Sequence, residues 1–325
     1  MVKSNLSKKT EINKKVLICI LYHNLKCNLE NFFKKIDTSK NFDFLIILDG
    51  VKKIKNQKKI FKKFKKIKIL KIKKQKNSIP KNRNLAIKYL KKKHYILLFL
   101  DSDIMPNKNL VKNHLNFHIK NKRIDVAGGF VKPSFEIKTK SIWQILDGCM
   151  SWFTSVNTGK SKLVKFPYHL PTCNLSIKSS VFKKKIFFNE KIETGEDAQF
   201  CKNVREKEGK IMLISNAEVV HDDRVYFREF LEHQLKWGSH QYYTLYKENF
   251  FNNKLKLLFY PCFFIIYPIL MPLINLFLSF LIILPWVKKK FYFILLQPLI
   301  YLVYLLKGLF TLKESISDSK NIFVS

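Results

Sequence analysis

The chain has 325 residues and a formal net charge of +37, from 61 basic and 24 acidic residues. This length allows one domain of about 200–250 residues and an appendage. So much positive charge would suit nucleic-acid binding, but only five of the basic residues are arginine, which base recognition favours. We therefore expect no nucleic-acid partner and interpret the lysines as compositional bias, with some contribution from docking on an anionic membrane.

The cysteine pattern and the N-terminal residues indicate the cellular compartment in which the protein works. The six cysteines form no C-x-x-C pair, which argues against a disulfide framework or structural zinc and favours a reducing compartment. Residues 1–14 are polar and basic, without the apolar stretch of a signal peptide. We expect them to form a basic tail, and the part that follows to stay in the cytoplasm.

The first hundred residues alternate between strand-like and helix-like segments. The apolar run 16–22 predicts a buried strand, and the pattern at 28–37 predicts a helix. A second strand at 44–48 ends on Asp49-Gly50, a turn signal. The alternation of strands and helices continues over the next fifty residues. This alternating order of elements predicts an open α/β sheet. Ligands bind such sheets at the carboxyl ends of the strands.

The remaining elements are predicted with different degrees of detail. The lysine-rich stretch 52–76 is typical of an amphipathic helix in its first half and of a strand at 66–73. The elements that follow are a helix from Pro80 and Asn82 to about 92, a buried strand at 94–103, a helix beyond Pro106, strands at 126–130, 174–177 and 211–215, and a helix that starts at 195–197. Residues 133–170 fit either a loop or a helical flap.

The C-terminal quarter has a different composition. Residues Leu257–Val287 form a run of 31 without a charge, and Phe291–Leu306 form another of 16 after Lys288-Lys289-Lys290. A membrane span needs about 20 apolar residues, so this region predicts membrane attachment. Its topology stays open between a kinked span and a re-entrant hairpin, because two simple crossings would place the three lysines outside, against the positive-inside tendency.

The acidic motif Asp101-Ser102-Asp103 closes the fourth predicted strand. Two carboxylates at a strand end suit Mg²⁺ or Mn²⁺. Such an ion is usually bound by a few protein ligands, and phosphate oxygens of the substrate complete its coordination. Arg83, one of few arginines, suits a bidentate contact with an anion. Further acids, Glu196-Asp197, stand at the start of a predicted helix, where the helix dipole alone would also favour them.

The sequence resembles the family 2 glycosyltransferases, which are inverting enzymes with the GT-A fold. The segments that carry the resemblance are VLICILYHN, LIILDG, the spaced RN-x-A-I of 81–89, FLDSDI, PTCNLSIK, GEDAQF and VVHDDR, in this order over roughly 15–240. The resemblance implies a Rossmann-like mixed sheet with helices on both faces, followed here by C-terminal hydrophobic helices.

The resemblance also implies roles for individual residues. The expected nucleotide-sugar-binding residues are Ile20, Tyr22, Asp49, Arg83, Asp101, Ser102, Asn174 and Glu196. Asp103, with Asp101 and His221, would hold the metal, although a structural histidine is the alternative for His221. Asp197 would be the general base that deprotonates the acceptor hydroxyl.

These observations predict a metal-dependent inverting glycosyltransferase that moves a sugar from a nucleoside-diphosphate sugar to a lipid-linked or cell-surface glycan acceptor. The expected cofactor is Mn²⁺ or Mg²⁺, and the expected location is the inner cell membrane, with membrane lipid as a partner. The segment 233–237 reads HQLKW where processive relatives carry Q-x-x-R-W, which favours one sugar per encounter. The alternatives are a polyprenyl-phosphate glycosyltransferase and a catalytically silent basic membrane scaffold.

The expected domain organisation follows from the same patterns. The segments are a tail at 1–14, a GT-A domain at 15–225, an amphipathic interfacial segment at 226–255, about two membrane-associated helices at 256–312 and a polar tail at 313–325.

Overall fold

The computed structural model describes residues 15–23, 29–36, 42–51, 53–54, 67–75, 78–165, 168–192, 194–241 and 256–323. The predicted basic tail and the helix predicted in the first half of 52–76 lie outside these residues. Contacts divide the chain into two units. Unit 1 comprises Met1–Lys132 and Asn157–Asp222, and unit 2 comprises Pro133–Val156 and Asp223–Ser325. Each unit is described by itself.

Unit 1 is built on a nine-stranded sheet with the order β3-β2-β1-β4-β8-β6-β9-β5, in which β7 pairs with β9. Its first four strands are parallel: β3 (Ile67–Ile72), β2 (Phe42–Asp49), β1 (Lys15–Tyr22) and β4 (His94–Asp101). Seven consecutive residues of β1 are buried, because helices cover both faces of a parallel sheet and the strand must be apolar on both sides.

The other half of the sheet is antiparallel. Strand β8 (Asn174–Lys178) runs antiparallel to β4 and to β6 (Val126–Pro133). Strands β5 (Ile104–Pro106) and β7 (Lys162–Leu163) run antiparallel to β9 (Ile211–His221). The sheet is therefore mixed, as predicted.

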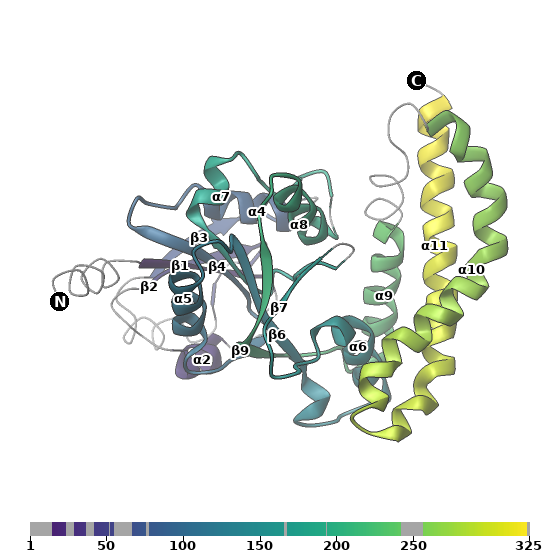
Figure 1. Cartoon of the computed structure of the whole chain (residues 1–325), viewed down its shortest axis with the longest axis horizontal. Helices are drawn as coiled ribbons and strands as arrows, with labels where there is room; N and C mark the ends of the chain where they lie inside the picture. Colours follow the sequence, from purple (N-terminus) through teal and green to yellow (C-terminus); the bar gives the residue numbers. More distant parts are fainter. Residues whose placement is uncertain are drawn as a thin grey trace. The chain divides into compact units, whose positions relative to one another are not determined.

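Helices lie on both sides of the sheet (Figure 1). Helices α4 (Ser78–Ile87), α7 (Ser179–Lys183) and α8 (Glu196–Glu206) cover one face, and α2 (Leu29–Lys35) and α5 (Leu110–Lys120) cover the other. Alternate residues of the central strands, such as Leu17, Cys19 and Leu97, Phe99, form the core under the first set. The predicted α/β class and mixed sheet are confirmed.

Several predicted boundaries differ from the observed ones. The helix expected to reach about 92 ends at Ile87, and the strand expected to reach Asp103 ends at Asp101. The chain turns after Asp101 because the next residues form β5, which pairs with a distant strand. The strand expected at 211–215 continues to His221 for the same reason, since its second half is the partner of β5.

Unit 2 is helical. It contains η1 (Ser134–Glu136), α6 (Ile142–Trp152), η2 (Phe153–Ser155), α9 (Phe227–Gln241), α10 (Lys256–Val287), η4 (Phe291–Leu296) and α11 (Gln297–Phe323). The unassigned stretch after residue 133 thus supplies a helix with a defined start, at which the Ser141 side chain accepts a hydrogen bond from the Gln144 amide. The segments Ile265–Val287 and Phe291–Ser317 are each long and apolar enough to cross a membrane.

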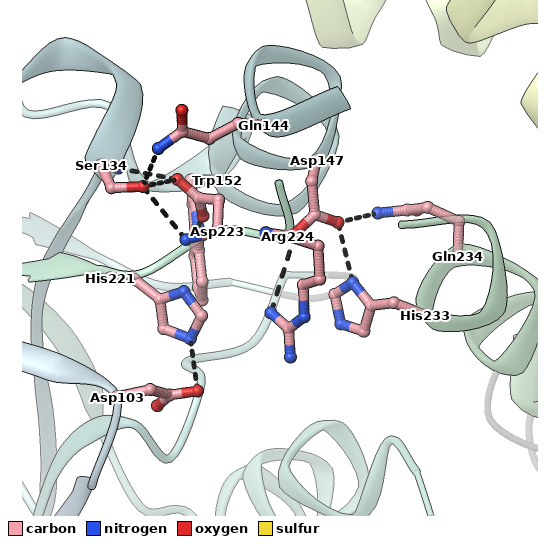
Figure 2. A network of polar contacts seen from close by, with 10 residues as sticks. All are labelled: Asp103, Ser134, Gln144, Asp147, Trp152, His221, Asp223, Arg224, His233 and Gln234. Carbon is pink, nitrogen blue, oxygen red and sulfur yellow. Dashed lines mark hydrogen bonds and ion pairs between the residues drawn. The ribbon is translucent and has the colours of Figure 1, made fainter. Parts of the chain in front are cut away.

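Two buried carboxylates stabilise unit 2: Asp147 joins α6 to α9, and Asp223 joins the segment before α9 to η1 and α6 (Figure 2). Asp147 accepts hydrogen bonds from His233 Nδ1 at 2.8 Å and from Gln234 Nε2 at 2.9 Å. Asp223 accepts from the Ser134 amide at 2.7 Å and from Trp152 Nε1 at 2.8 Å. Burial would raise the pKa of Asp147, but His233 and Arg224 lower it to about 2. Asp147 is therefore ionised under ordinary conditions and fixes the α6–α9 contact.

Candidate active site

The predicted donor residues meet at one edge of the sheet because three parallel strands end there. The β1–β4 register sets Leu21 opposite Asp101, and the β1–β2 register sets Tyr22 opposite Leu48, one residue before Asp49. The backbone of Ile20–Tyr22 thus lies between the strand that ends in Asp49 and the strand that ends in Asp101.

Asp49 is buried at the end of β2 and is held by a residue that the sequence analysis did not single out. Ser78 Oγ, at the start of α4, donates a hydrogen bond of 2.6 Å to Asp49 Oδ2. Gly50 follows with φ +71°, a left-handed conformation that favours glycine and turns the chain out of the strand. Nothing local predicts the Ser78 contact, because 29 residues separate the two side chains.

Arg83 is the electrostatic centre of the site. Its guanidinium is buried and forms an ion pair with Glu196. Burial alone would lower the pKa of Arg83, but Glu196, Asp101 and Asp197 raise it above its ordinary value. Burial and Asp197 raise the pKa of Glu196 to about 7, although Arg83 opposes that rise. One arginine is therefore paired with a carboxylate of the second acidic motif, and the charge of Asp101 in the first motif also raises its pKa.

The Asp101-Ser102-Asp103 motif is positioned by β4 and β5. Burial and the neighbouring Asp103 raise the pKa of Asp101, against the opposing effects of Arg83 and His221. Ser102 is buried, and its hydroxyl has no hydrogen-bond partner within the described part of the chain. The motif thus gathers polar groups that burial would disfavour without a ligand.

Asp103 and His221 face one another across the β5–β9 pair (Figure 2). Asp103 Oδ2 lies 3.6 Å from His221 Nε2, which is too long for a hydrogen bond. Two backbone contacts fix the pair: Ile104 is in register with His221, and the Asp222 amide donates to the Asp103 carbonyl at 3.0 Å. The sequence placed both residues at strand ends, but only the sheet brings them together.

The Asp103–His221 pair has donors that fit a divalent metal. A carboxylate oxygen and an imidazole nitrogen are ligands that Mn²⁺ accepts. Among the described residues, no three His, Cys, Asp or Glu side chains are grouped closely enough to hold an ion by themselves. The pair therefore fits an ion that completes its coordination with diphosphate oxygens, as Mg²⁺ and Mn²⁺ do in nucleotide sites.

Asp197 lies at the N-terminal end of α8, after Gly195 with φ +85°. Its side chain is mostly buried and lies 3.9 Å from His169 Nε2. His169 is the second residue near the site that the sequence analysis missed. It falls in the stretch 133–170, which carried no motif, so its proximity to α8 could not have been read from the sequence.

Asn174 is placed differently from the other predicted residues. It is 1% exposed, its Oδ1 lies 2.9 Å from His114 Nε2, and its amide donates to the Ala217 carbonyl at 2.7 Å. His114 and His118 both reach Ser176 Oγ, at 2.8 and 2.9 Å. This buried network gives the Asn174 side chain a structural place, and its predicted contact with sugar or acceptor stays a prediction.

A mixed α/β sheet with helices on both faces and acids at the ends of its parallel strands has the architecture of the GT-A glycosyltransferase fold. The family described as Glycosyl transferase family 2 matches residues 17–189, more than half of the 325 residues. The chain belongs to glycosyl transferase family 2 and is a glycosyltransferase. No curated protein sequence matches the chain.

One solved structure, with a TM-score of 0.50, supports the same fold, and two further structures are similar at lower scores. The crystal structure of S. aureus TarS 1–349 is 16% identical with a TM-score of 0.50, and the alignment covers 94% of this chain and 92% of that one. The same TarS fragment in complex with UDP is also 16% identical, with a TM-score of 0.47 and the same coverage of both chains. A structure of GalNAc-T7 with UDP, GalNAc and Mn²⁺ is 13% identical, with a TM-score of 0.49 over 70% of this chain and 51% of that one.

Proposed function

We propose that the chain is a metal-dependent inverting glycosyltransferase that uses a nucleoside-diphosphate sugar and works at the cytoplasmic face of the inner membrane. The observation that carries this proposal is the convergence of both acidic motifs on one buried arginine. Arg83 forms an ion pair with Glu196 of the second motif, and the charges of Glu196, Asp101 and Asp197 raise its pKa. A buried cation among acids suits a site that takes up an anionic diphosphate.

The donor is held at the strand ends in this proposal. Asp49 and the backbone of Ile20–Tyr22 bind the base and ribose, and Ser102 and Glu196 shape the diphosphate and sugar pocket around Arg83. Asp103 and His221, with Asp101, hold a divalent ion. A bound Mn²⁺ or Mg²⁺ supplies charge neutralisation to the departing nucleoside diphosphate.

Asp197 is the proposed general base. A hydroxyl is a weak nucleophile near neutral pH, so a positioned carboxylate must accept its proton as the new bond forms. The acceptor oxygen bonds to the anomeric carbon while the bond from that carbon to the diphosphate oxygen breaks on the opposite side. The proton passes to Asp197, the electron pair leaves with the diphosphate, and the anomeric configuration inverts.

The acceptor is a lipid-linked or cell-surface glycan, and one sugar is added at each encounter. Two apolar helices in the C-terminal part of the chain support attachment to a membrane, where lipid-linked acceptors reside. The lack of a Q-x-x-R-W segment at 233–237 supports single transfer.

The test is a thermal-shift panel on the detergent-solubilised chain with UDP, GDP, TDP and CMP, each with Mn²⁺ and with a chelator. A ligand that binds the folded state at about 100-fold saturation stabilises it by about 2.7 kcal/mol, which is a measurable shift. We expect a shift with one nucleotide that requires the metal. Asp103→Ala should abolish the metal-dependent part, whereas Glu206→Ala, on the exposed end of α8, should retain it. Metal-dependent transfer that survives in Asp103→Ala would contradict the site.

A further inference from the structure

We propose that the α10–α11 hairpin lies along the membrane surface and does not cross it, so that its turn and both of its ends face the same side as unit 1. This inference rests on the membrane attachment proposed above and concerns how that attachment is made. It follows from the polar elements that cover one face of the hairpin.

The turn of the hairpin is bound to the segment that enters α6. Lys289 Nζ forms an ion pair of 2.7 Å with Glu136, and Trp286 Nε1 donates to the Cys149 carbonyl at 3.1 Å. The rings of Phe135 and Trp286 also pack with centroids 5.5 Å apart. The turn between the two apolar helices is therefore anchored on α6 and η1.

Chain length alone limits how far Glu136 can lie from unit 1. Glu136 is four residues beyond Lys132, the last residue of the first part of unit 1. Four residues extend at most about 14 Å, which is less than half of the roughly 30 Å hydrocarbon core of a bilayer. The turn at Lys288–Lys290 therefore cannot reach the opposite side of a membrane while it contacts Glu136.

The middle of α11 is bound to a helix that carries charges on its outer surface. Lys307 Nζ donates to Gln234 Oε1 of α9 at 3.2 Å, and Thr311 Oγ1 donates to the Gly238 carbonyl at 2.9 Å. A side chain at Gly238 would meet the Lys307 backbone at 2.9 Å, so the two helices are in close contact. In Figure 1, α11 lies between α9 and α10.

Helix α9 cannot lie within hydrocarbon. Its exposed surface carries Arg228, with 88% of its side chain exposed, and Glu232, with 64% exposed. Glu229 and Lys236 are also exposed. Charged side chains in the bilayer centre are costly, so α9 must remain in water or among headgroups, and the Lys307–Thr311 part of α11 must lie at the same level.

The hairpin is thus held on the aqueous side at two places. These places are the turn at Trp286–Lys289 and the Lys307–Thr311 part of α11. Helix α11 begins at Gln297, shortly after the turn, and 14 steps of about 1.5 Å, or about 21 Å, separate Gln297 from Thr311. A helix whose two ends both stay near the same side of the membrane has to run along the surface. The three lysines of the turn then face the same side as unit 1, which removes the conflict with the positive-inside tendency.

The uncovered face of the hairpin has the chemistry of a lipid contact. The exposed apolar residues of the hairpin include Ile265, Ile269, Leu273 and Phe277 on α10 and Leu302 and Leu306 on α11. No charged residue occurs in Ile265–Val287, and exposed lysines, Lys288, Lys290 and Lys313, flank the apolar face. An apolar face bordered by lysines fits an anionic lipid bilayer, with the apolar residues below the headgroups and the lysines among them.

The test labels single cysteines in inverted inner-membrane vesicles, which expose the cytoplasmic face. The full chain, with Cys27 and Cys262 replaced by Ser, would carry Lys290→Cys, Lys313→Cys or, as a unit 1 control, Lys207→Cys. The four cysteines whose burial is described would react little. We expect a membrane-impermeant maleimide to label all three variants at similar rates, and detergent to change none of them.

Each other outcome has a distinct meaning. Labelling of Lys290→Cys only after detergent would show a crossing hairpin and overturn this inference while leaving membrane attachment intact. A chain that stays in the soluble fraction as a dimer would show that a second copy covers the apolar face, and would also contradict membrane attachment. Nucleotide binding and sugar transfer are measured separately and do not depend on either result.

A second measurement uses matched leucine variants. Leu273→Glu and Leu306→Glu, both on the exposed face, should each lower the membrane-bound fraction about tenfold in vesicle flotation, because a charge would enter the apolar layer. Leu163→Glu, at a half-exposed leucine of unit 1, should leave flotation unchanged. Equal flotation of all three variants would overturn the proposed lipid contact.

Discussion

Arg83 and Glu196 form an ion pair in the interior of unit 1 that joins helix α4 to helix α8, 113 residues further along the chain. Each of the two side chains is at most 7% exposed. Because burial removes both charges from water, the opposite charge of each partner stabilises the other.

This ion pair predicts a strong coupling between the two residues. Arg83→Gln or Glu196→Gln alone should destabilise the protein by about 3–5 kcal/mol, because each leaves an uncompensated buried charge. The double variant should lose much less than the sum. The measurement is a double-mutant cycle by urea unfolding in detergent. The exposed Arg228–Glu232 pair is the control and should show little coupling. Additive losses at Arg83 and Glu196 would contradict the pair.

The buried histidines predict acid sensitivity. Burial lowers the pKa of His114 to about 4 and of His118 to about 3, so both are neutral in the fold. In the unfolded chain each binds a proton below about pH 6.5. Stability should therefore fall as pH drops from about 6.5 toward 4, by up to about 2.7 kcal/mol per pH unit for two protons. Melting temperatures at a series of pH values measure this slope, and His118→Gln should reduce it. A flat profile above pH 4 would contradict the assignment.

Gly129 predicts a large effect of a single methyl group. A Cβ at this position would overlap the Ala217 carbonyl oxygen and the Asn174 amide, where β6 passes β9. Backbone cannot move aside as a flexible side chain can, so Gly129→Ala should destabilise unit 1 by more than about 3 kcal/mol. Gly159→Ala is the comparison, because open space surrounds Gly159 and only its φ of +76° opposes the change. Similar melting temperatures for both variants would show that the strands can separate.

Asp147 predicts a separate effect in unit 2. Asp147→Asn keeps the size of the side chain but removes the charge that faces His233 and Arg224. Because the folded pKa is depressed to about 2, the carboxylate stabilises the fold above its ordinary pKa near 3.8, and this is lost as pH falls through 2. We expect Asp147→Asn to lower the melting temperature at pH 7 and to leave metal-dependent nucleotide binding intact. Loss of nucleotide binding with an unchanged melting temperature would contradict this role.

His169 predicts a modest catalytic effect. It lies 3.9 Å from Asp197, close enough to orient the carboxylate but not to bond it in the ligand-free arrangement. His169→Ala should lower kcat by about tenfold to a hundredfold and shift the pH profile of transfer, with little effect on KM for the donor. His169→Gln should recover part of the loss. A change confined to donor KM would assign His169 to donor binding instead.

The sequence determined the sheet and the chemical groups of the site by itself. The apolar runs at 16–22 and 94–103 predict buried strands, and each predicted acid stands at or just beyond the end of a strand or at a helix start. These are local patterns, in which the burial of a strand and the polarity of the next residue are both encoded within a few positions. The positions of Asp49 and Asp101 at strand ends and of Glu196 at a helix start could therefore be predicted from the sequence, whereas their roles stay predictions.

The tertiary structure alone decided which of these groups meet. Arg83 forms an ion pair with Glu196, Asp103 lies opposite His221, and Asp49 accepts a hydrogen bond from Ser78. The two residues of each pair are far apart in the sequence. The assignment of 133–156 to the helical unit had no local signal either, because Asp147 and Asp223 fix it through contacts with distant residues. Pairing across a sheet or between helices depends on the path of the whole backbone, which no short pattern of residues contains.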